Sequence, residues 1–294
     1  MTETPTAVVL PASLSPSRAS DFMTCPLLYR FRVVDRLPEP PSAAATRGTL
    51  VHSVLEQLFD LPAVERTVTQ ANSLVEPSWA ALLADEPELA ALFEGDGAPT
   101  PAEFLAGAAP LLDAYFALED PTRLEPAERE VLVEVAVADD LVLRGYVDRL
   151  DVARDGAMRV VDYKTGRAPR DGFEQKAMFQ MRFYALVLWR LHGRIPRLLQ
   201  LLYLGSGERL QYEPDEADLL ATERKVRALW LAIRAAAERG DWRPHRSRLC
   251  DWCSYQALCP EFGGTPPPLP LVTIGPAVPV EPSDSPVRTP EEIL

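Results

Sequence analysis

The 294-residue sequence has no long apolar run, only three histidines and four cysteines, and fewer basic than acidic side chains. A membrane-spanning helix needs about 20 consecutive apolar residues, and no stretch of this chain approaches that length. The N-terminus has no basic start, and its short apolar piece is broken by Pro11, so it does not follow the pattern of a signal peptide. These absences predict a cytoplasmic protein that has no membrane partner.

The shortage of basic side chains gives a formal net charge of 30 − 43 = −13, which by itself argues against a nucleic-acid partner. The charge is unevenly distributed, however. Residues 56–140 contain 19 acidic and three basic side chains, a balance of 3 − 19 = −16, so the rest of the chain sums to +3. Seven Lys and Arg side chains gather between Lys225 and Arg248. Such a cluster can bind a phosphate backbone, although a solvated helix face has the same composition.

Composition divides the chain into three parts. Residues 1–13 are predicted to be a flexible leader. Residues 263–294 contain nine of the 29 prolines and are predicted to be a disordered tail, because such a composition cannot build a packed core. Residues 14–262 remain as one domain. Within it, an acidic insert at about 60–125 has apolar clusters separated by prolines, and we expect several short helices there.

The domain alternates between helical and strand-like periodicity. Apolar residues follow helical spacing over 47–59, 173–193 and 215–240, and the last two stretches end at a glycine, which suits a helix C-cap. Valine-rich alternation over 130–165 predicts three consecutive strands of a meander, and 197–205 predicts a further strand. Strands flanked by long helices indicate an α/β fold with a central sheet.

Asp162, Tyr163 and Lys164 stand at the end of one predicted strand. Because residues two apart share a face of a strand, we expect Asp162 and Lys164 to project together while Tyr163 points the other way. The preceding strand carries Asp148, and the turn at 154–156 would bring the two strands together antiparallel, so that both carboxylates converge. Carboxylates are the ligands that Mg²⁺ and Mn²⁺ prefer. Taken alone, a D-x-K triplet is a weak signal, and a surface ion pair explains it equally well.

Three further polar side chains lie on the neighbouring predicted helices. His52 shares a face with Glu56, and Gln180 shares a face with Tyr184 on the helix after the D-Y-K strand. A lone histidine on an amphipathic helix is more often a packed or surface residue than a ligand, and polar residues at the rim of a buried helix are common. Spacing alone therefore leaves a structural role open for all three.

The cysteines form a second group. Cys250, Cys253 and Cys259 give a C-x2-C-x5-C run after the basic helix, whereas Cys25 stands alone near the other end of the domain. A cytoplasmic chain disfavours disulfides, with a disulfide within the C-x2-C pair as a minor alternative. Zinc sites usually take their ligands as two pairs, so a three-plus-one arrangement favours an iron–sulfur cluster over zinc.

Six motifs occur in order along residues 14–262. They are Leu14-Ser15-Pro16-Ser17 with Cys25-Pro26, Gly48-Thr49-Leu50-Val51-His52, Gly145-x-x-Asp148, Asp162-Tyr163-Lys164-Thr165-Gly166, Gln180-x-x-x-Tyr184 and C-x2-C-x5-C. Their order resembles that of the RecB/AddB-type nucleases of the PD-(D/E)XK superfamily, in the branch that carries an iron–sulfur cluster. The resemblance implies a restriction-endonuclease-like α/β fold with a central mixed sheet flanked by helices. The helical acidic insert and an iron–sulfur-stapled C-terminal region are additions to that core.

The resemblance also implies roles for single residues. The ligands of a catalytic Mg²⁺ or Mn²⁺ would be His52, Asp148, Asp162 and the backbone carbonyl of Tyr163. Tyr163 stands where the family often has an acidic side chain, so only its carbonyl could serve the metal. Lys164 would orient the nucleophilic water and offset charge on the scissile phosphate. Gln180 and Tyr184 would position the substrate strand.

A [4Fe-4S] cluster would be ligated by Cys25, Cys250, Cys253 and Cys259. Its role would be structural, since the sequence shows no other anchor between the two ends of the domain. The acidic insert matches no motif of the family, and its charge would repel DNA.

We therefore expect a metal-dependent DNA exonuclease that hydrolyses single-stranded DNA or DNA ends in recombination or repair. The chain has no G-x-x-x-x-G-K-[ST] phosphate loop, so a helicase would be a separate partner. Two alternatives remain open. One is a catalytically inactive DNA-binding or scaffold module that partners a helicase, and the other is a CRISPR-adaptation nuclease, a class with the same core and four-cysteine arrangement.

Overall fold

A computed structural model of the chain describes residues 7–169 and 175–277. At its centre is a mixed sheet in which β2, β4, β5, β6 and β7 follow one another and β3 pairs with β4. The strands are β2 (Ser13–Leu14), β3 (Glu128–Ala138), β4 (Leu141–Val152), β5 (Met158–Lys164), β6 (Leu198–Tyr203) and β7 (Glu208–Tyr212). The α/β fold with a central mixed sheet is confirmed, and β3, β4 and β5 form the predicted antiparallel meander. Strand β7, the short edge strand, was not predicted from the sequence.

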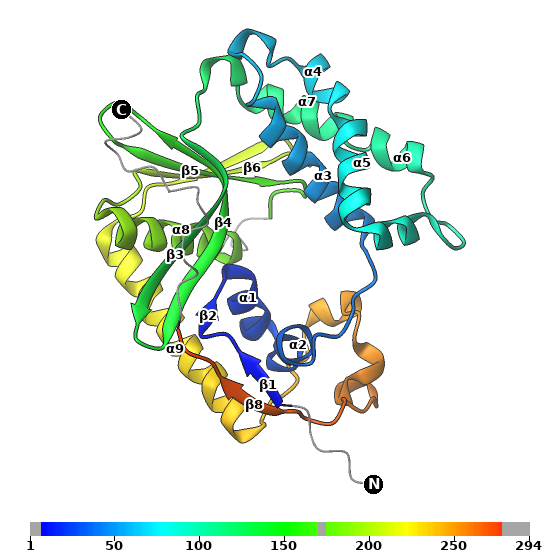
Figure 1. Cartoon of the computed structure of the whole chain (residues 1–294), viewed down its shortest axis with the longest axis vertical. Coiled ribbons are helices and arrows are strands. Elements are labelled where there is room, and N and C mark those ends of the chain that lie inside the picture. The colour runs from blue at the N-terminus through cyan, green and yellow to red at the C-terminus, as the bar shows by residue number, and fades with distance from the viewer. Residues whose placement is uncertain (1–6, 170–174, 278–294) are drawn as a thin grey trace.

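Helices cover both faces of this sheet (Figure 1). On one face lies α8 (Gln175–His192), and α9 (Glu216–Arg239) packs against it. On the other face lie α3 (Ala43–Leu58) and the acidic insert. The helices of the insert are α4 (Val68–Ser73), α5 (Val75–Asp85), α6 (Pro101–Ala106) and α7 (Ala109–Leu118). The two faces therefore bury two separate hydrophobic cores.

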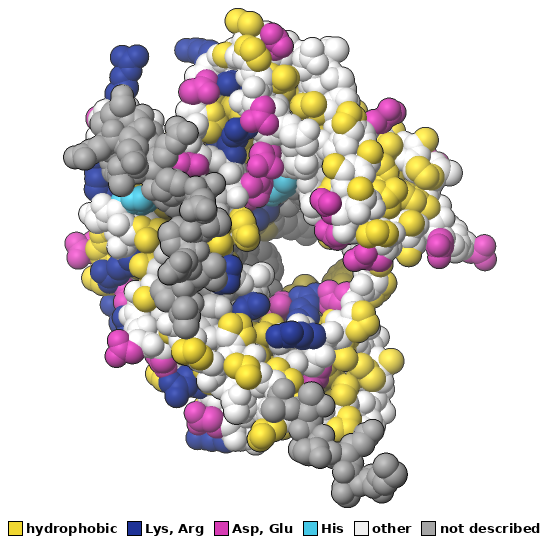
Figure 2. Space-filling model, in the orientation of Figure 1, with side chains coloured by type: hydrophobic (Ala, Val, Ile, Leu, Met, Phe, Trp, Pro, Cys, Tyr) yellow, Lys and Arg dark blue, Asp and Glu magenta, His cyan; other side chains and the backbone are white. Residues whose placement is uncertain are grey.

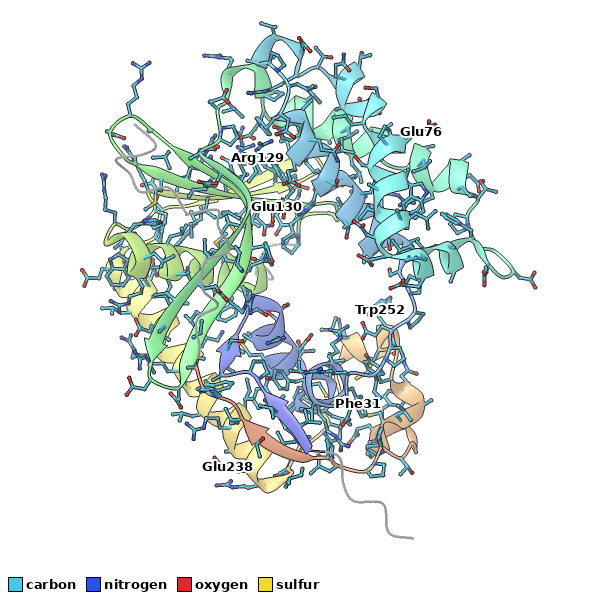
Figure 3. The ribbon with its side chains drawn as sticks, viewed as in Figure 1. Phe31, Glu76, Arg129, Glu130, Glu238 and Trp252 are labelled. Atoms are coloured by element: carbon cyan, nitrogen blue, oxygen red, sulfur yellow. The ribbon has the colours of Figure 1, made fainter. Side chains whose placement is uncertain are left out.

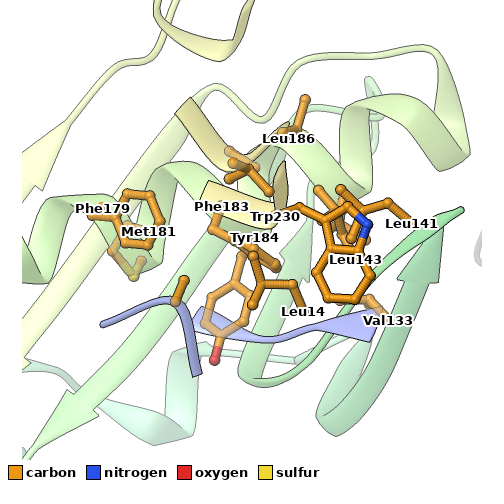
Figure 4. Close-up of a cluster of buried hydrophobic side chains, with 14 of the residues drawn as sticks. Leu14, Val133, Leu141, Leu143, Phe179, Met181, Phe183, Tyr184, Leu186 and Trp230 are labelled. Carbon is orange, nitrogen blue, oxygen red and sulfur yellow. The ribbon is translucent and has the colours of Figure 1, made fainter. Parts of the chain in front are cut away.

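Strand β5 takes part in both cores. Val160 packs into the core beneath α8, part of which Figure 4 shows, while Val161 and Tyr163 pack into the core beneath α3. This is the alternation expected of a strand that is covered on both faces. It places Asp162 and Lys164 toward α8 and the ring of Tyr163 toward α3, as the sequence pattern predicts.

One edge of β4 is shared between two strands. Because β3 occupies the opposite edge of β4, both β2 and β5 must pair with the remaining one. Strand β2 pairs in parallel at Val142 and Leu143, and β5 pairs antiparallel from Arg149 onward. Between these ladders, the five residues from 144 to 148 have neither strand beside them. The sheet is thus forked at the end of β5, next to Asp148.

The two ends of the described chain lie side by side. Strand β1 (Ala7–Leu10) pairs in parallel with β8 (Leu271–Ile274), next to α1 (Pro16–Thr24) and α2 (Pro26–Tyr29) (Figure 1). This differs from the expectation of a flexible leader and a disordered tail. The four-residue runs AVVL and LVTI are too short to stand out among prolines, yet each supplies the other with a ladder of backbone hydrogen bonds. Residues 1–6 and 278–294 of the same segments lie outside the described residues.

Among the described residues, no helix is both long and apolar enough to cross a membrane. Of the C-terminal cysteines, Cys250 lies on a short 3₁₀ turn at Arg248–Trp252 and Cys253 directly follows that turn. Cys259 lies between two further turns, Gln256–Leu258 and Pro260–Phe262.

Candidate active site

The site lies in the fork between β4 and β5. The last paired residues of the two strands are Arg149 and Val161, so Asp148 and Asp162 stand one position beyond the ladder. Asp148 Oδ2 accepts a 2.7 Å hydrogen bond from the backbone N–H of Tyr163, which ties its carboxylate to the diverging strand. Asp148 is therefore held against the end of the D-Y-K strand, and its convergence with Asp162 on one cation stays a prediction.

Side chains of α8 and of the end of β5 form a row of polar contacts in the same fork. Lys164 Nζ lies 2.7 Å from Asp162 Oδ2 and donates a 2.9 Å hydrogen bond to Gln180 Oε1. The amide of Gln180 donates to Asp162 Oδ1 at 2.9 Å and to the hydroxyl of Tyr184 at 3.1 Å. Gly145 on β4 permits this arrangement, because a Cβ there would stand 2.7 Å from the ring of Tyr184. Four of the predicted site residues thus form one hydrogen-bonded row.

Helix α3 brings His52 to the opposite side of the fork. Its Nε2 lies 3.0 Å from the carbonyl oxygen of Tyr163, and its Nδ1 lies 3.5 Å from Asp148 Oδ2. The ring is 26 % exposed at its side chain, so it faces the fork and is not packed in the core. Two other predicted ligand groups therefore lie beside this imidazole.

A residue that the sequence analysis did not select completes the cluster. Glu130 Oε1 lies 3.4 Å from His52 Nδ1. The ligand atoms of His52, Glu130 and Asp148 all lie within 4.8 Å of one another, a spacing that one cation can bridge. Figure 3 shows Glu130 and its neighbour Arg129 where β3 passes α3.

The backbone explains why Glu130 could not be selected. Its φ of +41° lies in the left-handed region, which is strained for a residue with a Cβ. Val147 and Leu150, three residues apart on β4, pack into the same core, whereas a regular strand would point them to opposite faces. The alternation of side chains between the two faces of the β3–β4 pair therefore reverses at Glu130 and Asp148. No residue pattern in the sequence signals such a reversal.

The electrostatics of the cluster show an excess of negative charge. Burial and the neighbouring charge of Asp162 raise the pKa of Asp148 to about 7. Burial alone would lower the pKa of His52, but its hydrogen bond to Glu130 and the charges of Asp148, Glu130 and Asp162 raise that pKa to about 9. Three carboxylates thus face one lysine and a protonated imidazole. Such a site can accept a hard divalent cation in exchange for protons.

A second charged network lies behind the site, on the α3 side of β5. The side chain of Arg149 is fully buried and donates to the hydroxyl of Tyr163 at 2.9 Å, to Glu119 at 2.8 Å and to Asp151 at 3.1 Å. Gln200 on β6 donates to the second oxygen of Glu119 at 2.8 Å. The network holds the ring of Tyr163, and so holds the strand whose carbonyl faces His52. The sequence analysis did not anticipate it.

The four cysteines come together at the far end of the molecule. They line one pocket of about 260 Å³, together with residues of α1 and α2 and the 3₁₀ turns. The backbone N–H of His245 donates to Cys25 Sγ and that of Ser247 donates to Cys250 Sγ, both at 3.3 Å. Burial raises the pKa of the Cys259 thiol, and the nearby thiols of the other three cysteines add to this effect. The remote Cys25 therefore joins the C-terminal three.

The cysteines are not the only link between the two ends of the domain, which corrects the expectation on this point. Besides the β1–β8 pair, the guanidinium of Arg30 donates a 2.6 Å hydrogen bond to the carbonyl of Pro267. The hydroxyl of Tyr255 donates to the carbonyl of Leu37 at 3.0 Å, and the ring of Tyr29 stacks on that of Trp242. Apolar packing and backbone hydrogen bonds thus join the ends as well.

Comparison with known proteins gives a consistent result. The sequence profile of the PD-(D/E)XK nuclease superfamily matches residues 13–260. The chain is 26 % identical over 272 residues to the Gene 69 protein of Mycobacterium phage D29, covering 84 % of this chain and 96 % of that protein. Its fold is similar to the crystal structure of the "Putative exonuclease" of Eubacterium rectale, with a TM-score of 0.52, 15 % identity, and coverage of 83 % of this chain and 88 % of that one.

Proposed function

The chain belongs to the PD-(D/E)XK nuclease superfamily, and from this premise we propose that it is a metal-dependent DNA exonuclease of the RecB/AddB type. The observation that carries the proposal is the meeting of His52, Asp148 and the Tyr163 carbonyl on one side of the fork with Asp162 and Lys164 on the other. Nucleases of this superfamily use divalent metals. A cluster of His and carboxylate oxygens is the donor set that Mg²⁺ or Mn²⁺ would take.

The site residues can be given separate tasks in phosphodiester hydrolysis. The metal ligands would be His52, Glu130, Asp148, Asp162 and the carbonyl oxygen of Tyr163. When bound, the cation supplies a water of lowered pKa and neutralises phosphate charge. Lys164, held between Asp162 and Gln180, can orient the attacking water and stabilise the negative charge that develops on the phosphate. Gln180 and Tyr184 extend this row away from the cluster, and we assign them to positioning of the substrate strand.

We assign the substrate as single-stranded DNA or a DNA end, in recombination or repair, with a separate helicase as the expected partner. The name of the Eubacterium rectale protein, "Putative exonuclease", agrees with this class of reaction. Of the seven Lys and Arg side chains of 225–248, Arg227, Arg234 and Arg243 pair with acidic side chains. The other four would contribute the positive potential that a phosphate backbone needs.

The direct test is a metal-supplemented assay on 5′- and 3′-labelled oligonucleotides, both single- and double-stranded. The purified protein with Mg²⁺ or Mn²⁺ should release short products from labelled ends, and Lys164→Ala should abolish this cleavage. Arg154→Ala, which changes an exposed cation in the β4–β5 turn, is the control and should cleave at the wild-type rate. A wild-type protein that binds DNA but cleaves none of these substrates would refute the nuclease and support the scaffold alternative.

We further propose that Cys25, Cys250, Cys253 and Cys259 ligate a [4Fe-4S] cluster. The donor set of four thiols around one pocket fits such a cluster. A single zinc with Zn–S bonds of about 2.3 Å would need sulfur atoms about 3.8 Å apart. Among the described residues, no three of the four sulfur atoms all lie within 4.8 Å of one another.

The cluster can be tested without reference to activity. Protein purified without oxygen should be brown, with broad visible absorbance and about four iron atoms per chain, and Cys253→Ser should lose the colour. Because β1, β8 and the Tyr29–Trp242 stack also join the two ends, we expect Cys253→Ser to lower the melting temperature without unfolding the chain. Colourless protein with one equivalent of zinc would refute the cluster and leave the nuclease proposal intact.

A further inference from the structure

A second pocket opens directly beside the candidate active site. It has a volume of about 650 Å³ and lies where the fork of the sheet leaves β4 without β2 or β5 beside it. One wall is the start of α1, another is the stretch of β4 around Gly145, and the third is α8 with Gln180 and Tyr184. Since these two α8 side chains also belong to the row that ends on Asp162, the pocket and the active site share a wall.

The charge of this pocket is opposite to that of the metal cluster. Its described lining residues include Arg18 and Arg144, the hydroxyls of three serines of the α1 segment, and no Asp or Glu. This is unusual for a chain with a net charge of −13. Arg144 is paired with Glu134 on β3 at 3.0 Å, so Arg18 supplies the remaining positive charge. Figure 2 shows Lys and Arg side chains along the part of the central opening that α1 borders in Figure 1. A nucleic-acid strand carries many negative charges, which the carboxylates of the metal cluster repel. The positive side of the pocket can bind such a strand.

The pocket also presents an exposed aromatic ring. Tyr146 is 56 % exposed, although it lies in the middle of a long strand. It stands two residues before Asp148 on β4, roughly 7 Å along the strand. That separation is comparable to the distance between adjacent phosphates of an extended single strand. A nucleotide next to the scissile phosphate could therefore place its base on the ring of Tyr146 and its phosphate near Arg18.

We propose that this pocket is the subsite that holds the nucleotide adjacent to the scissile phosphate of a single-stranded substrate. Tyr146 stacks on the base, and Arg18 with the neighbouring serine hydroxyls binds the backbone. The inference rests on the proposed nuclease function and adds the choice of a single strand. A base inside a duplex has both faces covered by its neighbours, whereas an unpaired base can stack on a side chain without regard to its identity.

The test measures binding separately from cleavage. Fluorescent oligothymidylate is titrated into Lys164→Ala protein, which is expected not to cleave, and into the same protein with a second change. Adding Tyr146→Ala should weaken single-strand binding about tenfold, in the range known for base–aromatic stacking, while adding Tyr146→Phe should leave it unchanged. Adding Arg18→Ala should reduce the slope of log affinity against log salt by about 0.7, the share of one phosphate on a single strand.

Two controls make the outcome decisive. Arg209→Ala, on the exposed edge strand β7, should leave both affinity and salt slope unchanged, and melting temperatures should be equal across the series. Unchanged single-strand affinity in both the Tyr146→Ala and Arg18→Ala proteins, with wild-type protein that still cleaves DNA, would overturn the subsite and spare the nuclease. Wild-type protein that neither binds nor cleaves DNA would overturn the proposed function, and the subsite with it.

Discussion

Two charged clusters border β5, one in the fork with β4 and one behind it around Arg149, and they differ in how their charges are balanced. Toward α3, Arg149 and Arg159 face Glu119 and Asp151, so that two cations meet two carboxylates. Burial would raise the pKa of Glu119, but the charge and hydrogen bond of Arg149 outweigh it and lower that pKa. In the fork between β4 and β5, the pKa of Asp148 is raised.

The comparison shows how burial acts on carboxylates that have different partners. Glu119 is bound by a guanidinium and stays ionised, which is the arrangement of a structural ion pair. Asp148 is close to Asp162 and Glu130, and no guanidinium of the described residues pairs with it. The first cluster is complete without a ligand. The second cluster would become balanced on binding a divalent cation, which is the property expected of an active site.

The largest expected effect is on catalysis. Asp148→Asn should lower the rate of DNA cleavage by about a thousandfold or more, because both metal binding and charge compensation are lost. The melting temperature of the metal-free protein should not fall, since the charge of Asp148 is unfavourable in the folded state. Asp139→Asn, in the exposed β3–β4 turn, should cleave normally. A metal-free Asp148→Asn protein that melts well below wild type would show that both clusters are structural.

The next effect is on stability, in the balanced cluster. Arg149→Met should lower the free energy of unfolding by about 3–5 kcal/mol, because Glu119 and Asp151 would remain as buried charges without their main partner. Arg159→Met removes a second partner of Asp151, but its side chain is 27 % exposed and the loss should be about 1 kcal/mol or less. Urea unfolding measures both losses. Equal losses in the two variants would contradict the assignment of Arg149 as the main partner of these carboxylates.

A smaller effect concerns Glu130. Glu130→Gln should weaken Mn²⁺ binding about 10- to 100-fold, the range seen when a residue that supports a metal site is removed. Calorimetric titration of Mn²⁺ into the metal-free protein measures this, with Glu128→Gln, two residues earlier on β3, as the control. If Glu130→Gln binds Mn²⁺ as wild type does, Glu130 lies outside the metal site.

The smallest effect is a pH dependence. His52 and Asp148 both have folded-state pKa values above their ordinary ones, about 9 and about 7, so the folded state binds protons more tightly than the unfolded state. Their contribution to stability is present at low pH and is lost as the pH rises, for Asp148 through about 7 and for His52 through about 9.

This dependence is measured as the melting temperature of metal-free protein between pH 6 and pH 9. The decrease across this range should be smaller in Asp148→Asn than in wild type, and the stabilisation by added Mn²⁺ should grow with pH, because the cation replaces protons. If the melting temperatures of wild type and Asp148→Asn changed with pH to the same extent, the cluster would not titrate in this way.

Much of the fold could be predicted because local periodicity reports burial. The long helices and the three-strand meander were readable from apolar spacing, and the alternation around Asp162 fixed which side chains share a face. The short strands β1, β7 and β8 were missed, because a run of four or five residues acquires its structure from the partner strand and carries little signal of its own.

Glu130 shows most clearly what sequence reasoning could not reach. Ala138 pairs with Leu141 across the turn, and continuing that register would place Glu130 opposite Arg149. A bulge between Ala136 and Ala138 shifts the register by one residue, so the pairs on either side of Glu130 place it opposite Asp148. One inserted residue in the hairpin therefore decides whether this carboxylate faces a cation or another carboxylate.

The sequence by itself determined the chemistry that is available: the D-Y-K strand end, the upstream Asp148, the i, i+4 pair on α8 and the four thiols. Only the tertiary structure decided that His52 from α3 and Glu130 from β3 join Asp148, that Arg149 supports the strand from behind, and that the chain ends pair as β1 and β8. The reason is physical. A side chain's type and local spacing are carried by its neighbours in sequence, whereas its partners are set by strand register and by packing between segments that lie far apart in the chain.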